Sequence, residues 1–340
     1  MTQQWQIRPA TVEEVSRVVA VQNAHSLEVL GTPRMAEHWQ LRRWYEDGVN
    51  LAQDTRVAVT DSGEIVGYAQ VIGEAPFVLI PVSGAVHPAY RGQGLGSCLL
   101  EWATARATEI AAKAPTPARV VMHSNLFAND EASIVLLMDQ GWAQVRQFVH
   151  LRLAMDKPPV EPTWPKGIEV RPLQPPDWAK VGPAMDEAFA DHWGTLTVEV
   201  AEEDDEAEPE GVIEKPVYDR EYWNTPGLCF VAWAGDEVAA VCLGNGKTFE
   251  WPEVGYLGSL SVRRAWRRQG LGEALILHVL GEFYRRGTRT VVTDTDGDGL
   301  TKAYRLYQKA GMTIFRQENV YEKEVRPGQD WLRRGWDGNS

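Results

Sequence analysis

Two glycine-rich segments carry the residue types that bind a pyrophosphate. The segments 91–96, RGQGLG, and 267–272, RRQGLG, share the pattern R-x-x-G-x-G between a β-prone run and a run with helical spacing of apolar residues. A helix start has free backbone N–H groups and the positive end of the helix dipole, and glycine lets this backbone approach a phosphate closely. The preceding arginine adds charged hydrogen-bond donors. The pattern therefore predicts a pyrophosphate site, and its appearance in both halves strengthens the prediction.

Two common nucleotide motifs do not fit these segments. A Walker loop, G-x-x-x-x-G-K-[ST], is absent from the sequence, which argues against ATP-type transfer. The dinucleotide fingerprint G-x-G-x-x-G is not met either, because Leu275 stands where its third glycine would be. Asp294 follows Gly272 at the distance of a ribose-binding acid, but a hairpin precedes the glycines here, whereas a dinucleotide fold opens with them.

The segment 294–300, DTDGDGL, resembles only the start of a calcium-binding loop. Its twelfth position is Arg305 instead of glutamate, and a β-prone run leads into it where an EF-hand has a helix. We therefore predict no metal site and expect these acids to form a turn after a strand, where they could meet a substrate ammonium. The histidines have no H-x-x-x-H spacing, and His192 in AFADHWG is interpreted as structural.

The two halves of the chain repeat the same order of segments. Each half predicts a short strand, a helix, a β-hairpin, a strand that leads into the glycine-rich segment, a helix and a buried strand. Thr11 and Glu14 have the spacing of a capping box at the first helix. The matching segments are 5–15 and 168–178, 86–103 and 262–279, and 142–147 and 312–317.

A proline-rich segment separates the two copies. Residues 155–166, MDKPPVEPTWPK, hold four prolines and no periodic pattern, which indicates a stiff linker. We therefore predict an N-terminal domain of residues 1–154 and a C-terminal domain of residues 167–340. The second copy also has an acidic run at 198–211, interpreted as a solvated loop.

This order of elements resembles the GNAT acyltransferase superfamily, twice over nearly the whole chain. The segment 306–312, LYQKAGM, is similar to the superfamily's L-Y-x-x-x-G-[FM] signature, and the tandem form resembles mycothiol synthases. The resemblance implies an α/β fold of two tandem GNAT-like domains, each with a mixed, mainly antiparallel sheet flanked by helices. It also implies acetyl-CoA as co-substrate, with its pyrophosphate on the glycine-rich loop and its pantetheine arm along the preceding strand.

The same resemblance implies a set of coenzyme A contacts in each half. In the second half, the contacts to the pyrophosphate are Arg267, Arg268, Gln269, Gly270, Leu271 and Gly272, and the strand residues that face pantetheine are Leu260 and Val262. In the first half, the matching residues are Arg91, Gln93, Gly94, Leu95 and Gly96, with Val86 on the strand.

The catalytic residues that the resemblance implies are present only in the second half. Tyr307 stands four residues before Gly311 and would protonate the leaving CoA thiolate, because the pKa of tyrosine is close to that of an alkyl thiol. Leu137 takes its place in the first half, which is therefore expected to be degenerate. Glu253 is the candidate base for the acceptor amine, although Tyr256 lies nearer the position where mycothiol synthases are expected to carry it.

Composition and charge narrow the classes of function that remain. The net charge of −13 argues against a phosphate-backbone binder, so no nucleic-acid partner is predicted. The sequence contains no apolar run long enough to span a membrane and no signal-peptide pattern, so neither membrane association nor secretion is predicted. The three cysteines form no C-x-x-C pair, which favours a reducing, cytoplasmic compartment.

We predict an acetyl-CoA-dependent N-acetyltransferase that acts on a primary amine of a small molecule, as a monomer or a homodimer. The alternatives that stay open are a non-catalytic acyl-CoA sensor or scaffold and a protein N-acetyltransferase. The acceptor itself cannot be named, because substrate-lining loops follow no portable motif.

Overall fold

In both halves of the chain, an arginine near the end of the first strand forms an ion pair with an acidic residue at the start of the following helix. Arg8 forms an ion pair with Glu14, whose carboxylate also accepts the backbone N–H of Thr11. The predicted capping box of Thr11 and Glu14 is thereby confirmed. In the second half, Arg171 pairs with Asp177 in the same way, at 2.7 Å. The repeat in the sequence is thus a repeat in the local structure.

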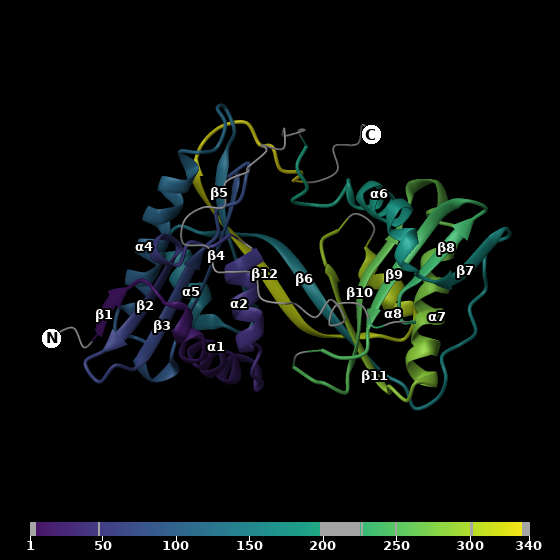
Figure 1. Ribbon diagram of the computed structural model, residues 1–340, viewed down its shortest axis with the longest axis horizontal. Helices are drawn as coiled ribbons and strands as arrows, with labels where there is room; N and C mark the ends of the chain where they lie inside the picture. Colours follow the sequence, from purple (N-terminus) through teal and green to yellow (C-terminus); the bar gives the residue numbers. More distant parts are fainter. Residues whose placement is uncertain are drawn as a thin grey trace. The chain divides into compact units, whose positions relative to one another are not determined.

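The computed structural model describes residues 5–46, 48–197, 225, 227–248, 250–299 and 302–334, and the acidic run 198–211 falls outside them. The described residues form two units (Figure 1). Unit 1 contains residues 5–145, 196–197 and 319–332, and unit 2 contains residues 146–195, 225–318 and 333–334, with the gaps just given.

Unit 1 is a mixed sheet with helices on both faces (Figure 1). Its strand order is β1-β2-β3-β4-β5-β12, with β1 to β4 antiparallel and β5 parallel to β4. Helices α1 and α2 pack on one face around Val57 and Tyr68, and α4 packs on the other through Leu95 and Leu99. The elements are β1 (Trp5–Arg8), α1 (Val15–Leu30), α2 (Glu37–Glu46), α3 (Leu51–Asp54), β2 (Thr55–Thr60), β3 (Ile65–Val71), β4 (Leu79–Val86), α4 (Leu95–Ala111), β5 (Val120–Phe127) and α5 (Glu131–Asp139).

Unit 2 has the same layers. Its strand order is β12-β6-β11-β10-β9-β8-β7, with β10 parallel to β11. Because side chains alternate along a strand, Val231 and Val241 pack against α6, while Ala232 and Cys242 lie in the core beneath α7. The elements are β6 (Ala143–Ala154), β7 (Ile168–Pro172), α6 (Trp178–Phe189), β8 (Phe230–Ala234), β9 (Glu237–Asn245), β10 (Gly255–Val262), α7 (Leu271–Arg285), β11 (Thr290–Asp296), α8 (Ala303–Lys309) and β12 (Thr313–Arg326). The predicted mixed, mainly antiparallel sheets flanked by helices are confirmed.

The last strand of each half completes the sheet of the other half. β6 belongs to the first half by sequence, but it pairs with β11 and buries Val149 and Leu151 in the core of unit 2. The later part of β12 lies beside β5, and its Tyr321 is buried in the core of unit 1. The units therefore differ from the predicted domains 1–154 and 167–340 at these strands, because long-range pairing, which the sequence repeat does not record, decides where each strand is buried.

Candidate active site

The glycine-rich loop of each half ends at an open helix start. Gly270 precedes α7 and Gly94 precedes α4, with φ of 81° and 83° and no side-chain cap. A Cβ at either glycine would meet no atom within 4 Å, so the space beside each of these glycines is open. Arg268, with φ of 61°, adopts the left-handed conformation that Gly92 adopts in the first half. Both loops have the geometry that an anion at a helix start requires.

The first arginine of each motif is engaged by its own half. Arg267 donates to Asp191 at 2.6 Å and to the carbonyl oxygens of Ala188 and Val262. Burial opposes ionisation of Asp191, but the hydrogen bond from Arg267 outweighs it and holds the pKa of that carboxyl below its usual range. Arg267 thereby ties the loop to the end of α6. Its guanidinium is used by these contacts within unit 2, whereas the sequence predicted a phosphate as its partner.

Arg91 has the matching role in the first half. It pairs with Glu28 at 2.8 Å and hydrogen-bonds His25 at 2.9 Å, and both partners are on α1. Arg268 differs from both, because its side chain is exposed and forms no ion pair among the described residues. Of the three arginines, Arg268 is the one whose charge is available to a ligand.

The remaining motif residues act through the backbone or through packing. The side chains of Leu271 and Leu95 are buried in the cores, so only their N–H groups can reach a ligand. A Cβ at Gly272 would approach the Leu306 side chain to 3.1 Å, so this glycine allows α7 to pack against α8. Gly96 lies as close to Leu136. Gln269 and Gln93 bond carbonyl oxygens within their own loops, those of Ala265 and Ala89.

The parallel strands β10 and β11 separate after two residue pairs. They are in register only at Gly255 with Val291 and Tyr256 with Val292. Beyond this point β10 continues to Val262 while pairing only with β9, and its register with β9 shifts between Leu257 and Ser259. The β11-facing edge of β10, which includes Leu260 and Val262, is therefore free of strand pairing where a pantetheine arm is expected. The same parting follows three pairs in the first half, ahead of Val86.

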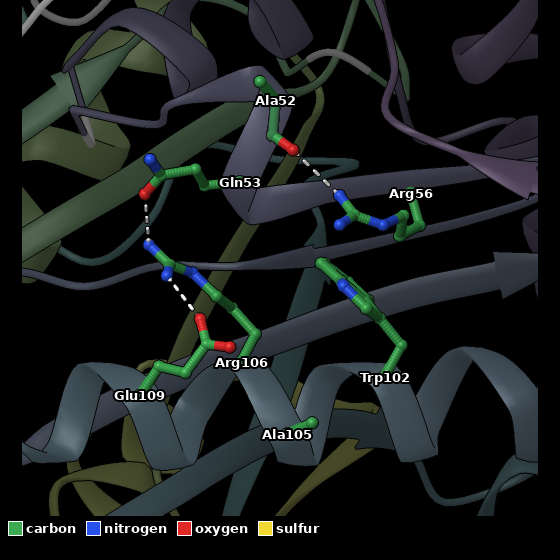
Figure 2. Close-up of a pocket in the computed structure, with 7 residues that line it drawn as sticks. All are labelled: Ala52, Gln53, Arg56, Trp102, Ala105, Arg106 and Glu109. Carbon is green, nitrogen blue, oxygen red and sulfur yellow. Dashed lines mark hydrogen bonds and ion pairs between the residues drawn. The ribbon is translucent and has the colours of Figure 1, made fainter.

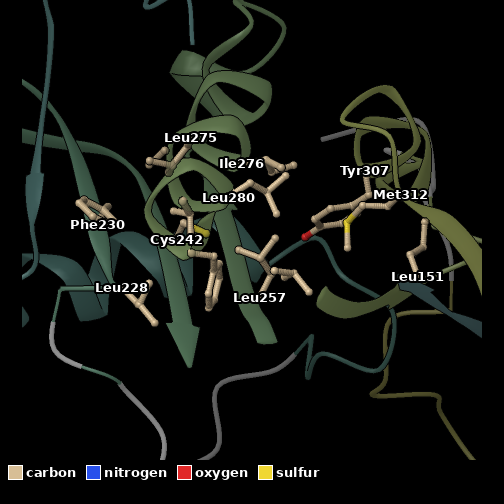
Figure 3. Packing of buried hydrophobic residues seen from close by; sticks show 14 of the residues in the cluster. Leu151, Leu228, Phe230, Cys242, Leu257, Leu275, Ile276, Leu280, Tyr307 and Met312 are labelled. Carbon is tan, nitrogen blue, oxygen red and sulfur yellow. The ribbon is translucent and has the colours of Figure 1, made fainter. Parts of the chain in front are cut away.

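Tyr307 is buried in the core of unit 2 with 5% of its surface exposed (Figure 3). Burial raises the pKa of its hydroxyl, the Cys242 thiol adds to the rise, a hydrogen bond with Thr293 opposes it, and Asp294 raises it further. Thr293 Oγ1 also donates to the carbonyl oxygen of Leu257 at 2.8 Å, across the point where the strands separate. The phenol therefore lies beside this point in its protonated form, as a general acid must.

The two candidate bases lie in different surroundings. Glu253 is exposed in the turn before β10, two residues short of the strand. Tyr256, on β10 itself, donates its hydroxyl proton to Asp294 Oδ1 at 2.5 Å. Asp294 is on β11, next to Thr293. The structure thus brings Tyr256 and Asp294, rather than Glu253, to the point where the strands separate.

The described residues of the first half, 5–46 and 48–154, have no such constellation. Leu137 is buried in the core of unit 1. His123, at the position of Thr293, is 7% exposed and contacts Glu322 of β12 at 2.8 Å, and Glu322 also binds Arg119. In the first half, His123 and its partners therefore take the place of the hydrogen-bonded hydroxyls of Thr293 and Tyr307.

β6 adds residues that the sequence analysis missed. Arg146 pairs with Asp296 at 2.6 Å, and His150 contacts Glu318 at 3.2 Å. His192 packs edge-on against Phe189, and burial is the main cause that lowers its pKa. Arg146 and His150 belong to the first half by sequence, and the β6–β11 pairing places them beside the acids of β11, Asp294 and Asp296.

A surface hollow of about 390 Å³ lies in unit 1 (Figure 2). Arg106 on its wall bonds Glu109, Gln53 and Asp54, and Arg56 bonds the carbonyl oxygen of Ala52. Both arginines are thus already held by neighbouring groups, and none of the predicted site residues lines the hollow.

The turn after β11 shows how its acids are used. Asp296 is bound by Arg146, and Asp298 accepts the backbone N–H of Gln147 at 2.9 Å. Within the described part of the chain, no group of three His, Cys, Asp or Glu residues is arranged to hold a metal ion. No helix in the described ranges is long and apolar enough to cross a membrane.

Two family descriptions match the chain, one in each half. Residues 197–312 match the acetyltransferase (GNAT) family, and residues 53–135 match the acetyltransferase (GNAT) domain. Mycothiol acetyltransferase of Streptomyces bingchenggensis is 26% identical over 337 residues, covering 94% of this chain and 95% of that protein. Mycothiol acetyltransferase of Streptomyces scabiei is 27% identical over 77% of each chain.

Solved structures agree in fold over nearly the whole length. A GCN5-related N-acetyltransferase from Sphaerobacter thermophilus superimposes with a TM-score of 0.76 at 29% identity, covering 97% of this chain and 98% of that one. A tandem GNAT protein from the clavulanic acid biosynthesis pathway has a TM-score of 0.62 at 18% identity, covering 96% of this chain and all of that one. The chain therefore shares its fold over nearly its whole length with a known tandem GNAT protein.

Proposed function

We propose that the C-terminal half of this tandem of two GNAT-like domains, residues 167–340, transfers acetyl from acetyl-CoA to a primary amine of a small molecule. The observation that carries this assignment is the buried Tyr307 hydroxyl beside the parting of β10 and β11, behind an open glycine-rich helix start. The name of the mycothiol acetyltransferase relatives supports a small-molecule acceptor.

Acetyl-CoA supplies the thioester, and the residues at the start of α7 fit its pyrophosphate. The first N–H groups of α7 have no partner within the helix, the space beside Gly270 is open, and the exposed Arg268 guanidinium adds positive charge. The unpaired edge of β10 at Leu260 and Val262 offers backbone groups to the pantetheine amides. Arg267 holds this loop to α6 and so positions it.

Tyr307 gives its proton to the departing CoA thiolate. Burial keeps the phenol protonated by raising its pKa, and Thr293 orients it. Backbone N–H groups where the β9–β10 register shifts would stabilise the oxyanion of the attacked carbonyl. The sequence predicts Glu253 as the base for the amine. Because Glu253 lies in an exposed turn, Asp294 is the second candidate for this role, and the two are compared by experiment below.

The N-terminal half is proposed to be a degenerate copy. It keeps the open helix start at Gly94 but has Leu137 in place of the acid. It therefore binds coenzyme A structurally or binds none, and it does not turn over.

The test is CoA thiol release by the full chain with acetyl-CoA and a panel of small primary amines. Tyr307→Phe should lower kcat about 100-fold or more, the size of a general-acid contribution, with the KM for acetyl-CoA unchanged. Tyr304→Phe, the same change three residues away on α8, is the matched control. A wild-type kcat in Tyr307→Phe would contradict the acid assignment. Binding of acetyl-CoA without turnover across the panel would favour a sensor instead.

A further inference from the structure

Asp294 follows Thr293 on β11, just past the last residue pair with β10. Successive strand residues point to opposite faces of a sheet. Thr293 contacts Tyr307 on the α8 side, so Asp294 points to the other side, where Tyr256 donates to it at 2.5 Å. Where β10 and β11 separate, one face of the sheet thus carries the Tyr307 phenol, a proton donor, and the other face carries the Asp294 carboxylate.

The acids of β11 and of the turn after it differ in their partners, and Asp298 in the turn accepts the backbone N–H of Gln147. Asp296, two residues after Asp294 and on the same face, is held by two donors of Arg146. Among the described residues, Asp294 forms no ion pair with an arginine or a lysine. His150 lies opposite Asp294 on β6 and is itself in contact with Glu318. An ammonium group entering here meets a carboxylate that accepts the Tyr256 hydroxyl and that no arginine or lysine of the described residues neutralises.

The comparison between the halves supports a catalytic use. Ser124 stands at the position of Asp294 in the first half, and Ile80 stands at that of Tyr256. The carboxylate and its hydroxyl partner are therefore missing from the same half that lacks Tyr307. Glu253 and Asp294 are both exposed, but Glu253 lies in a turn before β10 begins, whereas Asp294 lies on β11 just past its last residue pair with β10.

We propose that Asp294 is the base that deprotonates the acceptor amine and that Tyr256 is its positioning residue. This inference rests on the proposed acetyl transfer. The acceptor enters as an ammonium ion and gives one proton to the Asp294 carboxylate. The amine nitrogen then forms a bond to the thioester carbonyl carbon, the carbon–sulfur bond breaks, and the sulfur takes a proton from Tyr307. The second amine proton passes to Asp294 once this carboxyl has given the first to water. Of the two protons that leave the nitrogen, one is the net proton that the reaction releases to solvent, and the other, through solvent, restores the Tyr307 phenol.

The experiment compares Asp294→Asn with Glu253→Gln in the full chain. Asp294→Asn should lower kcat with a primary alkylamine at least 100-fold and leave the KM for acetyl-CoA unchanged. With hydroxylamine, which is already unprotonated at neutral pH, the loss should shrink by tenfold or more, a change that a purely structural defect would not produce. Tyr256→Phe should lower kcat by about tenfold with the same dependence on the acceptor. Glu253→Gln should stay within threefold of wild type.

A control and a second variant guard against misfolding. Asp298→Asn changes a carboxylate of the same turn that only caps the Gln147 N–H, and its kcat should match wild type. Asp294→Ser places the first-half residue in the second half and should show the same loss of kcat as Asp294→Asn. If one of these two variants melts early, the other still tests the role of the carboxylate.

Two results would overturn the inference, and they differ. If wild type transfers acetyl while Asp294→Asn keeps its kcat, or while Glu253→Gln carries the loss, the base is not Asp294 and the proposed function stands. If wild type releases no thiol with any amine, the proposed function fails and takes this assignment with it.

Discussion

The glycines that precede α7 and α4 offer a matched pair of substitutions. Gly270 and Gly94 have nearly the same φ, and a Cβ at either meets nothing within 4 Å. Replacement by alanine therefore adds no clash, and its cost in folding is the strain of a left-handed residue, about 1–2 kcal/mol. For units of this size that corresponds to a fall in melting temperature of roughly 2–8 °C, equal in the two variants.

The effect on turnover should separate the two variants. The methyl group of Gly270→Ala stands in the open space that the pyrophosphate needs, so a charge-assisted hydrogen bond is lost. A loss of about 1.5–3 kcal/mol raises the KM for acetyl-CoA roughly 10- to 150-fold. Gly94→Ala should leave the KM and kcat of the enzyme within twofold of wild type, because the half that it alters lacks the acid.

The assay is thiol release at varied acetyl-CoA, with thermal melting of both variants in the absence of ligand. Equal melting shifts with unequal KM values would support the assignment. Loss of turnover in Gly94→Ala with full turnover in Gly270→Ala would show that the catalytic role has been given to the wrong half. A melting shift far larger in one variant would refute the claim that neither site is sterically occupied.

Two further outcomes are expected. Arg268→Ala should raise the KM for acetyl-CoA several-fold with no change in melting temperature, because the side chain is exposed, whereas Arg267→Ala should lower the melting temperature because it breaks the bonds to the end of α6. A fragment of residues 167–334 should be unfolded by circular dichroism, whereas 143–334 should fold, because β6 fills the core of unit 2; a folded 167–334 would contradict the strand exchange.

The local part of this structure follows from the sequence. The capping box at Glu14, the glycine-rich helix starts and the order of strands and helices all depend on residues within a few positions of one another. Such patterns are set by backbone conformation and helix geometry, which a single sequence records directly. The repeat of these patterns was enough to predict the layers of both units.

What the sequence did not predict depends on partners that are far apart along the chain. The exchange of β6 and β12 places Arg146 and His150 in unit 2, although the repeat assigns them to the first half. The partner of the motif arginine Arg267 is likewise far away along the chain. Arg267 was expected on a phosphate, but Asp191, 76 residues earlier, binds it, and no spacing rule connects the two.

The loss of chemistry in the first half involves more than one residue, and this predicts the result of restoring the tyrosine. Leu137→Tyr would bury a hydroxyl where His123 is already in contact with Glu322, so the Thr293-like partner is absent. An unsatisfied buried hydroxyl costs about 1–3 kcal/mol, and the larger ring adds overpacking. The variant should therefore melt earlier and gain no turnover when the second site is silenced by Tyr307→Phe. Thiol release from that double variant above the level of Tyr307→Phe alone would show that a single side chain had been missing, and that the polar surroundings of the acid matter less than its presence.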